Sequence, residues 1–113
     1  MIKNLTNKKV ISKNAKFCSS MFSRFKGLML SKKQETALIF EFKKEQFISL
    51  HMLFVFYPID VLFLDKTKKV VDMKECFRPF SFYNSRKRAM YAVELFNGAV
   101  NKSKTKIGDR INF

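Results

Sequence analysis

The chain has 113 residues, of which 47% are hydrophobic and 15% aromatic, and this length fits one domain spanning residues 1–113. Glycine and proline number only three and two, so the composition excludes collagen-like and low-complexity chains. Lys and Arg total 23 against nine Asp and Glu, and the formal charge of +14 bears on partners rather than on the fold.

No segment predicts a membrane span or a secretory signal. The longest nearly apolar stretch, residues 50–64, is too short to cross a bilayer as a helix and contains polar residues. Residues 1–10 carry lysines and have no apolar core. We therefore expect a cytoplasmic protein without a membrane partner, in which Cys18 and Cys76 are reduced thiols.

A short strand and a helix are the first predicted elements. Val10 and Ile11 lie between polar residues, which favours a strand. Asn14 offers an N-cap, and the apolar residues after it recur at three- and four-residue steps, which predicts an amphipathic helix. This apolar stripe consists of Ala15, Cys18, Met21, Phe22, Phe25 and Met29. Gly27 is expected to be the C′ residue that stops the helix.

The middle of the chain predicts strands. Runs of β-branched and aromatic residues indicate strands over 36–42 and 47–56. After a proline, residues 59–64 resume as a strand that is apolar on both faces. The polar residues 65–69 predict a turn that joins this strand to 70–73 as a hairpin.

The last part of the chain predicts a loop, a strand and two turns. Residues 78–85 are interpreted as a connecting loop pinned by Phe77, Phe80 and Phe82. Alternation predicts a strand over 89–95, and a short turn or helix is expected at 98–104. Residues 107–113 close the chain, and the structural turn positions of this part are Gly98, Gly108 and Asp109.

The order of these elements indicates the fold class. Strands outnumber helices and do not alternate with them, which predicts an α+β fold that is mainly β. We expect a single small curled antiparallel sheet, or a barrel-like β domain, with one or two short helices packed against it.

Several short motifs resemble a known family. They are Gly27-Leu28-Met29, His51-Met52, Pro58-Ile59-Asp60 through Phe63-Leu64-Asp65, Val93-Glu94-Leu95 with Gly98, and Ile107-Gly108-Asp109. In this order and spacing, over residues 10–113, they resemble the DUF192 family, also called UPF0127, and especially its archaeal members. The family is one of unknown function, so the resemblance implies a compact, mainly β domain and supplies no reaction. Many members have Trp where His51 stands and Arg where Ser31 stands.

Asp60 and Glu94 are the candidate carboxylates. Asp60 lies within an apolar strand, where an unpaired carboxylate would cost several kcal/mol, so it must have a partner. That partner is either a set of backbone N–H groups, a lysine, or a ligand. Glu94 also lies on an apolar strand and either points to solvent or converges with Asp60 as an acid and base pair.

His51 is the only histidine, which excludes a metal site of several histidines. With Met52, Asp60 and Glu94 it is a candidate for binding a ligand. No spacing of cysteine, histidine or carboxylate predicts a metal site, no glycine cluster predicts a phosphate loop, and no cofactor is expected. No complete catalytic set is visible either.

The positive charge is concentrated at the two chain ends. Residues 1–33 hold nine basic side chains and no acidic one, and residues 84–113 hold seven basic and two acidic ones. Phosphate contacts from such side chains release counterions, so salt-sensitive binding to RNA or DNA is expected. Phe17, Phe22 and Phe25 either stack on bases or belong to the core.

Three functions remain open from the sequence. The first is a ligand-binding module with a pocket near His51, Asp60 and Glu94 for a small or acidic ligand. The second is a basic protein associated with RNA or DNA through its termini. The third is a small enzyme that uses a carboxylate pair. The sequence does not indicate the oligomeric state.

Overall fold

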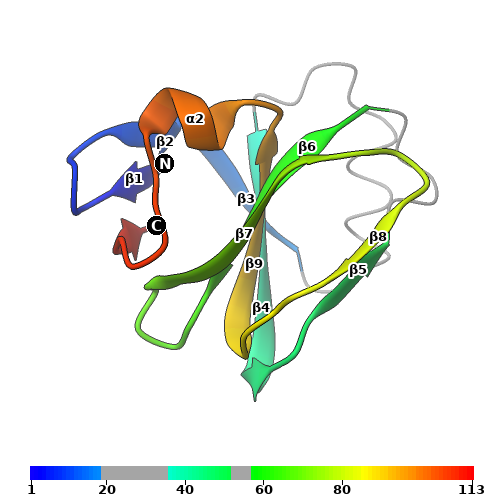
Figure 1. The fold of residues 1–113 in the computed structure, drawn as a ribbon. Helices are drawn as coiled ribbons and strands as arrows, with labels where there is room; N and C mark the ends of the chain where they lie inside the picture. The colour runs from blue at the N-terminus through cyan, green and yellow to red at the C-terminus, as the bar shows by residue number, and fades with distance from the viewer. Residues whose placement is uncertain (19–35, 52–56) are drawn as a thin grey trace.

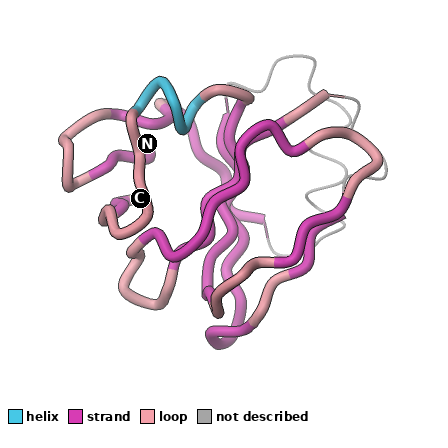
Figure 2. Tube along the Cα trace, viewed as in Figure 1, coloured by secondary structure: helices cyan, strands magenta, loops and turns pink. Residues whose placement is uncertain are grey.

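The computed structural model describes residues 1–18, 36–51 and 57–113, which are mainly strands (Figure 1). The strands are β1 (Ile2–Asn4), β2 (Val10–Ser12), β3 (Asn14–Cys18), β4 (Thr36–Gln46), β5 (Ser49–His51), β6 (Ile59–Leu64), β7 (Val70–Phe77), β8 (Phe82–Asn84), β9 (Ala89–Phe96) and β10 (Ile111–Asn112). The one helix of the described ranges, α2 (Ala99–Ser103), stands out in Figure 2. No helix within these ranges is long and apolar enough to cross a membrane.

The described strands form three sheets that lie in layers. A five-stranded sheet with the order β3-β4-β9-β6-β7 is in the middle. The three-stranded sheet β10-β1-β2 packs with α2 on one face, and the two-stranded sheet β5-β8 covers the other (Figure 1). The two chain ends are neighbours, because β1 pairs with β10.

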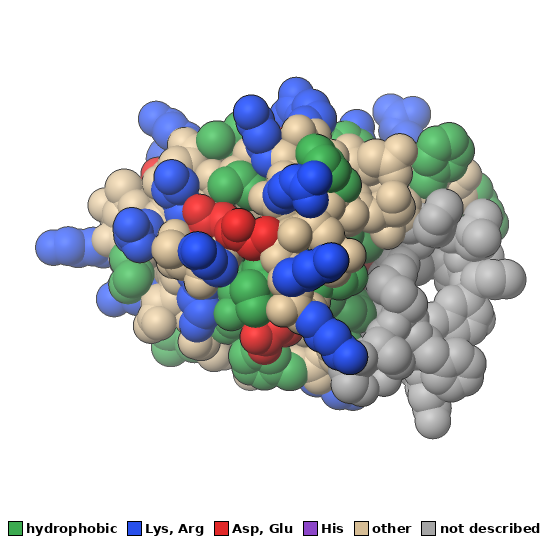
Figure 3. Space-filling view, turned by 90° about the horizontal axis from the view of Figure 1, so that it is seen from below, with side chains coloured by type: hydrophobic (Ala, Val, Ile, Leu, Met, Phe, Trp, Pro, Cys, Tyr) green, Lys and Arg blue, Asp and Glu red, His purple; other side chains and the backbone are tan. Residues whose placement is uncertain are grey.

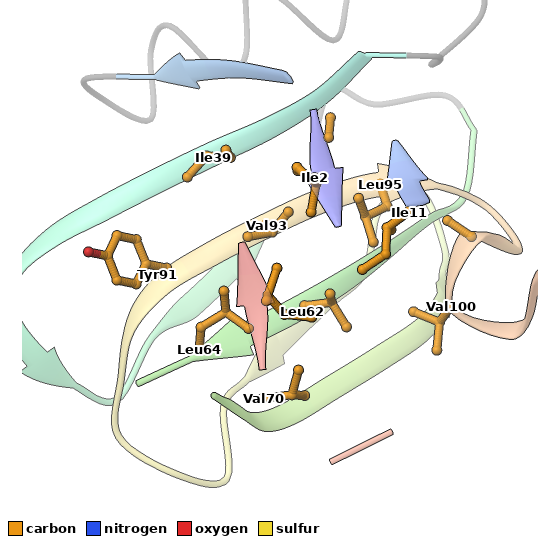
Figure 4. Close-up of a cluster of buried hydrophobic side chains, with 13 residues drawn as sticks. Ile2, Ile11, Ile39, Leu62, Leu64, Val70, Tyr91, Val93, Leu95 and Val100 are labelled. Atoms are coloured by element: carbon orange, nitrogen blue, oxygen red, sulfur yellow. The ribbon is translucent and has the colours of Figure 1, made fainter. Parts of the chain in front are cut away.

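Each face of the central sheet carries its own hydrophobic core. The side chains of β6 alternate between the faces, and all of them are buried. Leu62 and Leu64 belong to the core under the three-stranded sheet (Figure 4). Val61 and Phe63 belong to the core under β5-β8. The predicted strand with two buried faces is therefore confirmed.

Most of the predicted strands are present. Those expected at 10–11, 36–42, 59–64, 70–73 and 89–95 correspond to β2, β4, β6, β7 and β9, and α2 lies within 98–104. The predicted hairpin is confirmed by the antiparallel pair β6-β7, in which Leu62 stands opposite Met73. Of the strand predicted over 47–56, the structure describes β5 and leaves 52–56 outside its ranges.

The helix predicted after Asn14 is wrong in the part that the structure describes. Asn14–Cys18 is β3, a parallel neighbour of β4, with Ala15 opposite Ala37. The three-residue step from Ala15 to Cys18 fits a helix, but the edge of β4 supplies backbone partners along the whole segment, and such long-range pairing overrides local preference. The rest of the stripe and Gly27 lie outside the described residues. The sheet is thus not purely antiparallel.

The expectation of a single sheet or a barrel is also corrected. The described strands form three sheets, and the edges of the central one, β3 and β7, do not pair with each other. The sequence did not predict β1 or β8, and β8 lies inside the expected loop 78–85. Phe77 is buried as expected, whereas Phe80 and Phe82, which were expected to pin the loop, are 65% and 72% exposed.

Candidate functional site

The buried carboxylate of Asp60 joins three elements. Asp60 lies on β6, and its Oδ1 accepts a hydrogen bond from the backbone N–H of Cys76 on β7 at 2.9 Å. Its Oδ2 accepts hydrogen bonds from the N–H groups of Gly98 and Val100 at 3.1 and 3.0 Å. Gly98 is the N-cap of α2 and has no side chain that could accept a hydrogen bond. Asp60 on β6 instead accepts the N–H groups at the start of this helix and so caps it. Backbone groups are therefore partners of this carboxylate.

Glu94 lies on the opposite face of the central sheet. In the β6-β9 ladder, Asp60 stands opposite Leu95 and Glu94 stands opposite Val61. Directly paired residues of antiparallel strands share a face, and neighbours along a strand alternate. Leu95 belongs to the core under the three-stranded sheet and Val61 to the core under β5-β8. The two buried carboxyl groups therefore do not converge, and Glu94, which is 2% exposed, does not point to solvent either, so both alternatives for Glu94 are wrong.

His51 ends β5, on the side of the central sheet that Glu94 faces. Its cross-strand partner is Phe82 of β8, and Met52 lies outside the described residues. Asp60 is separated from both His51 and Glu94 by the central sheet. One pocket lined by all three predicted residues is consequently not formed.

The predicted turn glycines have left-handed backbone. Gly98 and Gly108 have φ angles of 93° and 98°, which glycine adopts without a Cβ clash. Asp109 closes its turn by accepting the backbone N–H of Lys106 at 2.9 Å. Within the described ranges, no group of three or more His, Cys, Asp or Glu side chains is placed to hold a metal ion.

A third buried carboxylate, Asp72, was not predicted. It lies on β7, and its Oδ2 accepts hydrogen bonds from the Tyr83 hydroxyl and the Arg86 backbone N–H at 2.8 and 2.9 Å. The Arg86 guanidinium donates to Oδ1 at 2.8 and 3.2 Å. Burial alone would raise the pKa of the Asp72 carboxyl, but the hydrogen bonds from Arg86 and Tyr83 lower it below its ordinary value.

Other acidic side chains accept hydrogen bonds from backbone N–H groups of their own turn or of a neighbouring turn. The Oδ1 of Asp65 accepts the N–H groups of Thr67 and Lys69 at 2.8 and 3.0 Å. Although partial burial would raise the pKa of Asp65, hydrogen bonds from Thr67 and Lys69 lower it. Glu45 accepts the backbone N–H of Lys66 at 2.8 Å. Much of the negative charge of the described residues is thus buried or bound to backbone N–H groups.

The basic side chains, in contrast, are on the surface. Every described Lys and Arg is exposed except Lys3, Lys68 and Lys74, which are partly buried. Figure 3 shows Lys and Arg side chains spread over the underside of the molecule around a few acidic ones. Arg86 and Asp72 form the only salt bridge within the described part of the chain. The described surface is therefore strongly basic.

One open groove of about 690 Å³ combines basic and aromatic side chains. We call it the basic groove, and its lining includes Phe47, Lys69, Lys87, Arg88 and Ile107. Phe47 is 58% exposed, and the Arg88 guanidinium lies 4.9 Å from the centre of its ring. Cations beside an exposed aromatic face suit a ligand that has both phosphates and flat rings.

The two chain ends meet at a second open groove of about 570 Å³. We call it the terminal groove, and its lining includes Lys9, Lys104 and Lys106 together with the acidic Glu75 and Asp109. Basic residues of both chain ends therefore lie together here. Each of the two grooves has two carboxylates in its lining, but the terminal groove has no aromatic ring there.

Sequence reasoning missed Asp72 and the residues of the basic groove. The run Arg86-Lys87-Arg88 was a usable signal, because three consecutive cations mark an exposed basic segment. No local pattern indicates that Asp72 and Arg86, 14 residues apart, form a pair.

Comparison with known proteins gives a consistent family. The model of DUF192, described as "Uncharacterized ACR", matches residues 2–113. A UPF0127 protein of Thermococcus sibiricus is 37% identical over 100% of this chain and 74% of its own length. A UPF0127 protein of Pyrococcus furiosus is 36% identical over 97% of this chain and 95% of its own length.

Two solved structures have a similar fold. A Sinorhizobium meliloti protein described as a candidate transcription regulator has a TM-score of 0.78 and 24% identity, with 87% of this chain and 79% of that chain covered. A Novosphingobium aromaticivorans protein of unknown function has a TM-score of 0.77 and 17% identity, with 88% and 74% covered. At these identities the likeness shows the fold alone.

Proposed function

The chain belongs to the DUF192 family, also called UPF0127, which is described as uncharacterized, and we propose from its surface that it binds nucleic acid. The observation that carries this proposal is the separation of charge. The carboxylates of Asp60, Asp72 and Glu94 are buried, while Lys and Arg side chains cover the surface. At the surface, a polyanion therefore meets a larger excess of basic over acidic side chains than the composition of the whole chain implies.

The basic groove is the part of this surface that best fits a nucleic acid backbone. Its two acidic lining residues, Glu45 and Asp65, already accept backbone N–H groups. Its cations Lys69, Lys87 and Arg88 are exposed side chains, whereas Arg86 is committed to Asp72. The terminal groove is the less suitable site, because no aromatic side chain is among its lining residues.

A small-ligand module, which the sequence favoured, is less well supported. The carboxylate oxygens of Asp60 accept hydrogen bonds from three backbone N–H groups, and Asp60 lies on the opposite face of the central sheet from Glu94. A ligand that touched both carboxylates would have to pass through the buried central sheet. The candidate regulator from Sinorhizobium meliloti shares the fold only, so the proposal rests on this chain's own surface.

Salt-dependent binding tests the proposal. We expect the purified protein to bind a labelled mixed-sequence single-stranded RNA. The logarithm of the association constant should fall linearly with the logarithm of the salt concentration. The triple variant K69Q/K87Q/R88Q removes up to three phosphate contacts, so the slope should decrease by roughly 2 and binding at low salt should weaken roughly ten-fold. Fluorescence anisotropy from low to physiological salt measures both quantities.

The matched control is K9Q/K104Q/K106Q in the terminal groove, which removes the same charge. If both triple variants lose the same affinity and slope, binding follows bulk charge and the basic groove is not a site. If the terminal variant alone loses affinity, the phosphates bind at the chain ends instead. Wild-type binding that vanishes at physiological salt would contradict the proposed function itself.

A further inference from the structure

We propose that Arg86 is the residue of the basic groove that binds phosphate directly, and that the buried carboxylate of Asp72 positions its guanidinium for this contact. This inference rests on the proposed function and deepens it. Lys69, Lys87 and Arg88 supply charge to the groove, whereas Arg86 supplies a contact of fixed geometry. The group that fits such a contact is the phosphodiester of a nucleic acid backbone, whose two non-bridging oxygens can accept a pair of parallel N–H groups.

The bond to Asp72 uses one edge of the Arg86 guanidinium. Nε and Nη2 donate to Asp72 Oδ1 at 3.2 and 2.8 Å. A guanidinium has five N–H groups, so these two bonds leave one on Nη2 and two on Nη1. The Arg86 side chain is 69% exposed and lines the basic groove. The edge formed by Nη1 and Nη2 is therefore the one that a phosphate in the groove can meet.

Asp72 is a fixed anchor because both of its oxygens are bonded in a buried place. It is 1% exposed, and its Oδ1 also accepts the backbone N–H of Met73 at 2.9 Å. Its Oδ2 accepts the Tyr83 hydroxyl and the Arg86 backbone N–H. The Tyr83 ring stacks on Phe63 of the core with a centroid distance of 5.7 Å. Asp72 thus holds Arg86 at its backbone and at its guanidinium, so this side chain loses less conformational freedom on binding than a surface lysine does.

The segment that carries Arg86 is attached to the fold without the guanidinium. Ser85 donates its backbone N–H to the Ile48 carbonyl at 2.8 Å, and its Oγ accepts the Ile48 N–H at 2.9 Å. The Tyr83 hydroxyl and the Arg86 backbone N–H bond to Asp72 in addition. An ion pair whose cation is exposed adds little stability to such an attachment. The position of the Arg86 guanidinium is therefore better explained by a contact with a ligand.

The neighbouring cations explain how a neutral ion pair can lie in a phosphate site. Arg86 and Asp72 together have no net charge, so the pair by itself attracts a distant anion only weakly. Lys69, Lys87 and Arg88 line the same groove as exposed side chains. Their field brings the phosphate into the groove, and the Arg86 edge then binds it at short range.

Two variants separate this contact from binding by bulk charge. R86K keeps the charge but has no planar pair of N–H groups, and D72N keeps Arg86 but removes one negative charge. Bulk charge predicts wild-type affinity for R86K and tighter binding for D72N. We expect both variants to bind a labelled single-stranded RNA roughly five- to ten-fold more weakly, with the salt slope of R86K unchanged. Fluorescence anisotropy at several salt concentrations measures affinity and slope.

E45Q and R110K are the matched controls. Glu45 lines the basic groove, so E45Q removes the same charge as D72N without touching Arg86, and it should bind at least as tightly as the wild type. Arg110 is exposed and is not among the described lining residues of the groove, so R110K should bind like the wild type. Circular dichroism establishes that every variant is folded.

The double variant D72N/R86K distinguishes positioning from a general loosening of the fold. If Asp72 acts through Arg86, D72N costs no further affinity once R86K is present. Losses that add, or a D72N variant that binds like E45Q, would refute the positioning role of Asp72.

The single variant R86K decides the phosphate contact, because it changes an exposed side chain and keeps Asp72 paired with a cation. Wild-type affinity in R86K refutes the contact, while the proposed function stands as long as the wild type binds RNA at physiological salt. If the wild type does not bind there, the proposed function fails, and the contact at Arg86 fails with it.

Discussion

Replacing Asp60 with Asn is expected to lower the free energy of unfolding by about 3 kcal/mol, and Asp60→Ala should lower it further. The carboxylate accepts three backbone hydrogen bonds, and each bond to a charged group is worth about 1.5–3 kcal/mol. In the Asn variant an amide NH₂ must face backbone N–H donors. In the Ala variant the N–H groups of Gly98 and Val100 lose their partner. Urea denaturation followed by circular dichroism measures the difference.

The size of this loss is large for a small domain. Such domains are stable by only about 5–15 kcal/mol, so the Ala variant approaches the limit of folding. The matched control is E75Q on β7, because Glu75 is an exposed acid one residue from Cys76. If D60N unfolds at the same urea concentration as E75Q, the Asp60 carboxylate does not stabilise the contact between β6, β7 and α2 that its hydrogen bonds indicate.

The central strands could be predicted because their sequences agree with their environment. β6 is a continuous apolar run, and such runs occupy sheet centres where both faces are covered. The turn at 65–69 is polar and starts with Asp65, whose side chain bonds the turn backbone. Local pattern and global structure coincide at these positions.

The β3 and β8 strands could not be predicted from local pattern. β3 contains the step from Ala15 to Cys18, which fits a helix, and it becomes a strand only through its pairing with β4. β8 is three residues long and contains the exposed Phe82. The Phe82 ring was expected to be buried and to hold the loop, because sequence alone does not show which face of a strand is covered.

The candidate site was predicted in part. Burial of Asp60 and its need for a partner followed from the apolar residues around it. Its donors, Cys76, Gly98 and Val100, are 16 to 40 residues away, and no spacing rule identifies them. The separation of Asp60 and Glu94 depends on the register of two strands, where a shift of one residue would reverse the result.

The free energy of unfolding is expected to decrease as the pH falls below about 4, and Asp72 supplies part of that decrease. The hydrogen bonds from Arg86 and Tyr83, opposing the effect of burial, lower its pKa in the folded protein below the unfolded value of about 3.9. A lowered folded pKa gives stability that is fully present above the unfolded pKa and is lost as the pH falls through the folded one.

The variant D72N should therefore be less stable at pH 7, by about 2–3 kcal/mol, and should lose less stability between pH 5 and pH 3 than the wild type. The pKa of Asp65 is also lowered, by its own turn, so some pH dependence must remain in D72N and decrease only in D65N/D72N. Urea denaturation at stepwise pH measures these slopes. Parallel curves for D72N and the wild type would show that Asp72 does not lose a proton on folding at low pH, and that its bonds to Arg86 and Tyr83 do not favour the charged form.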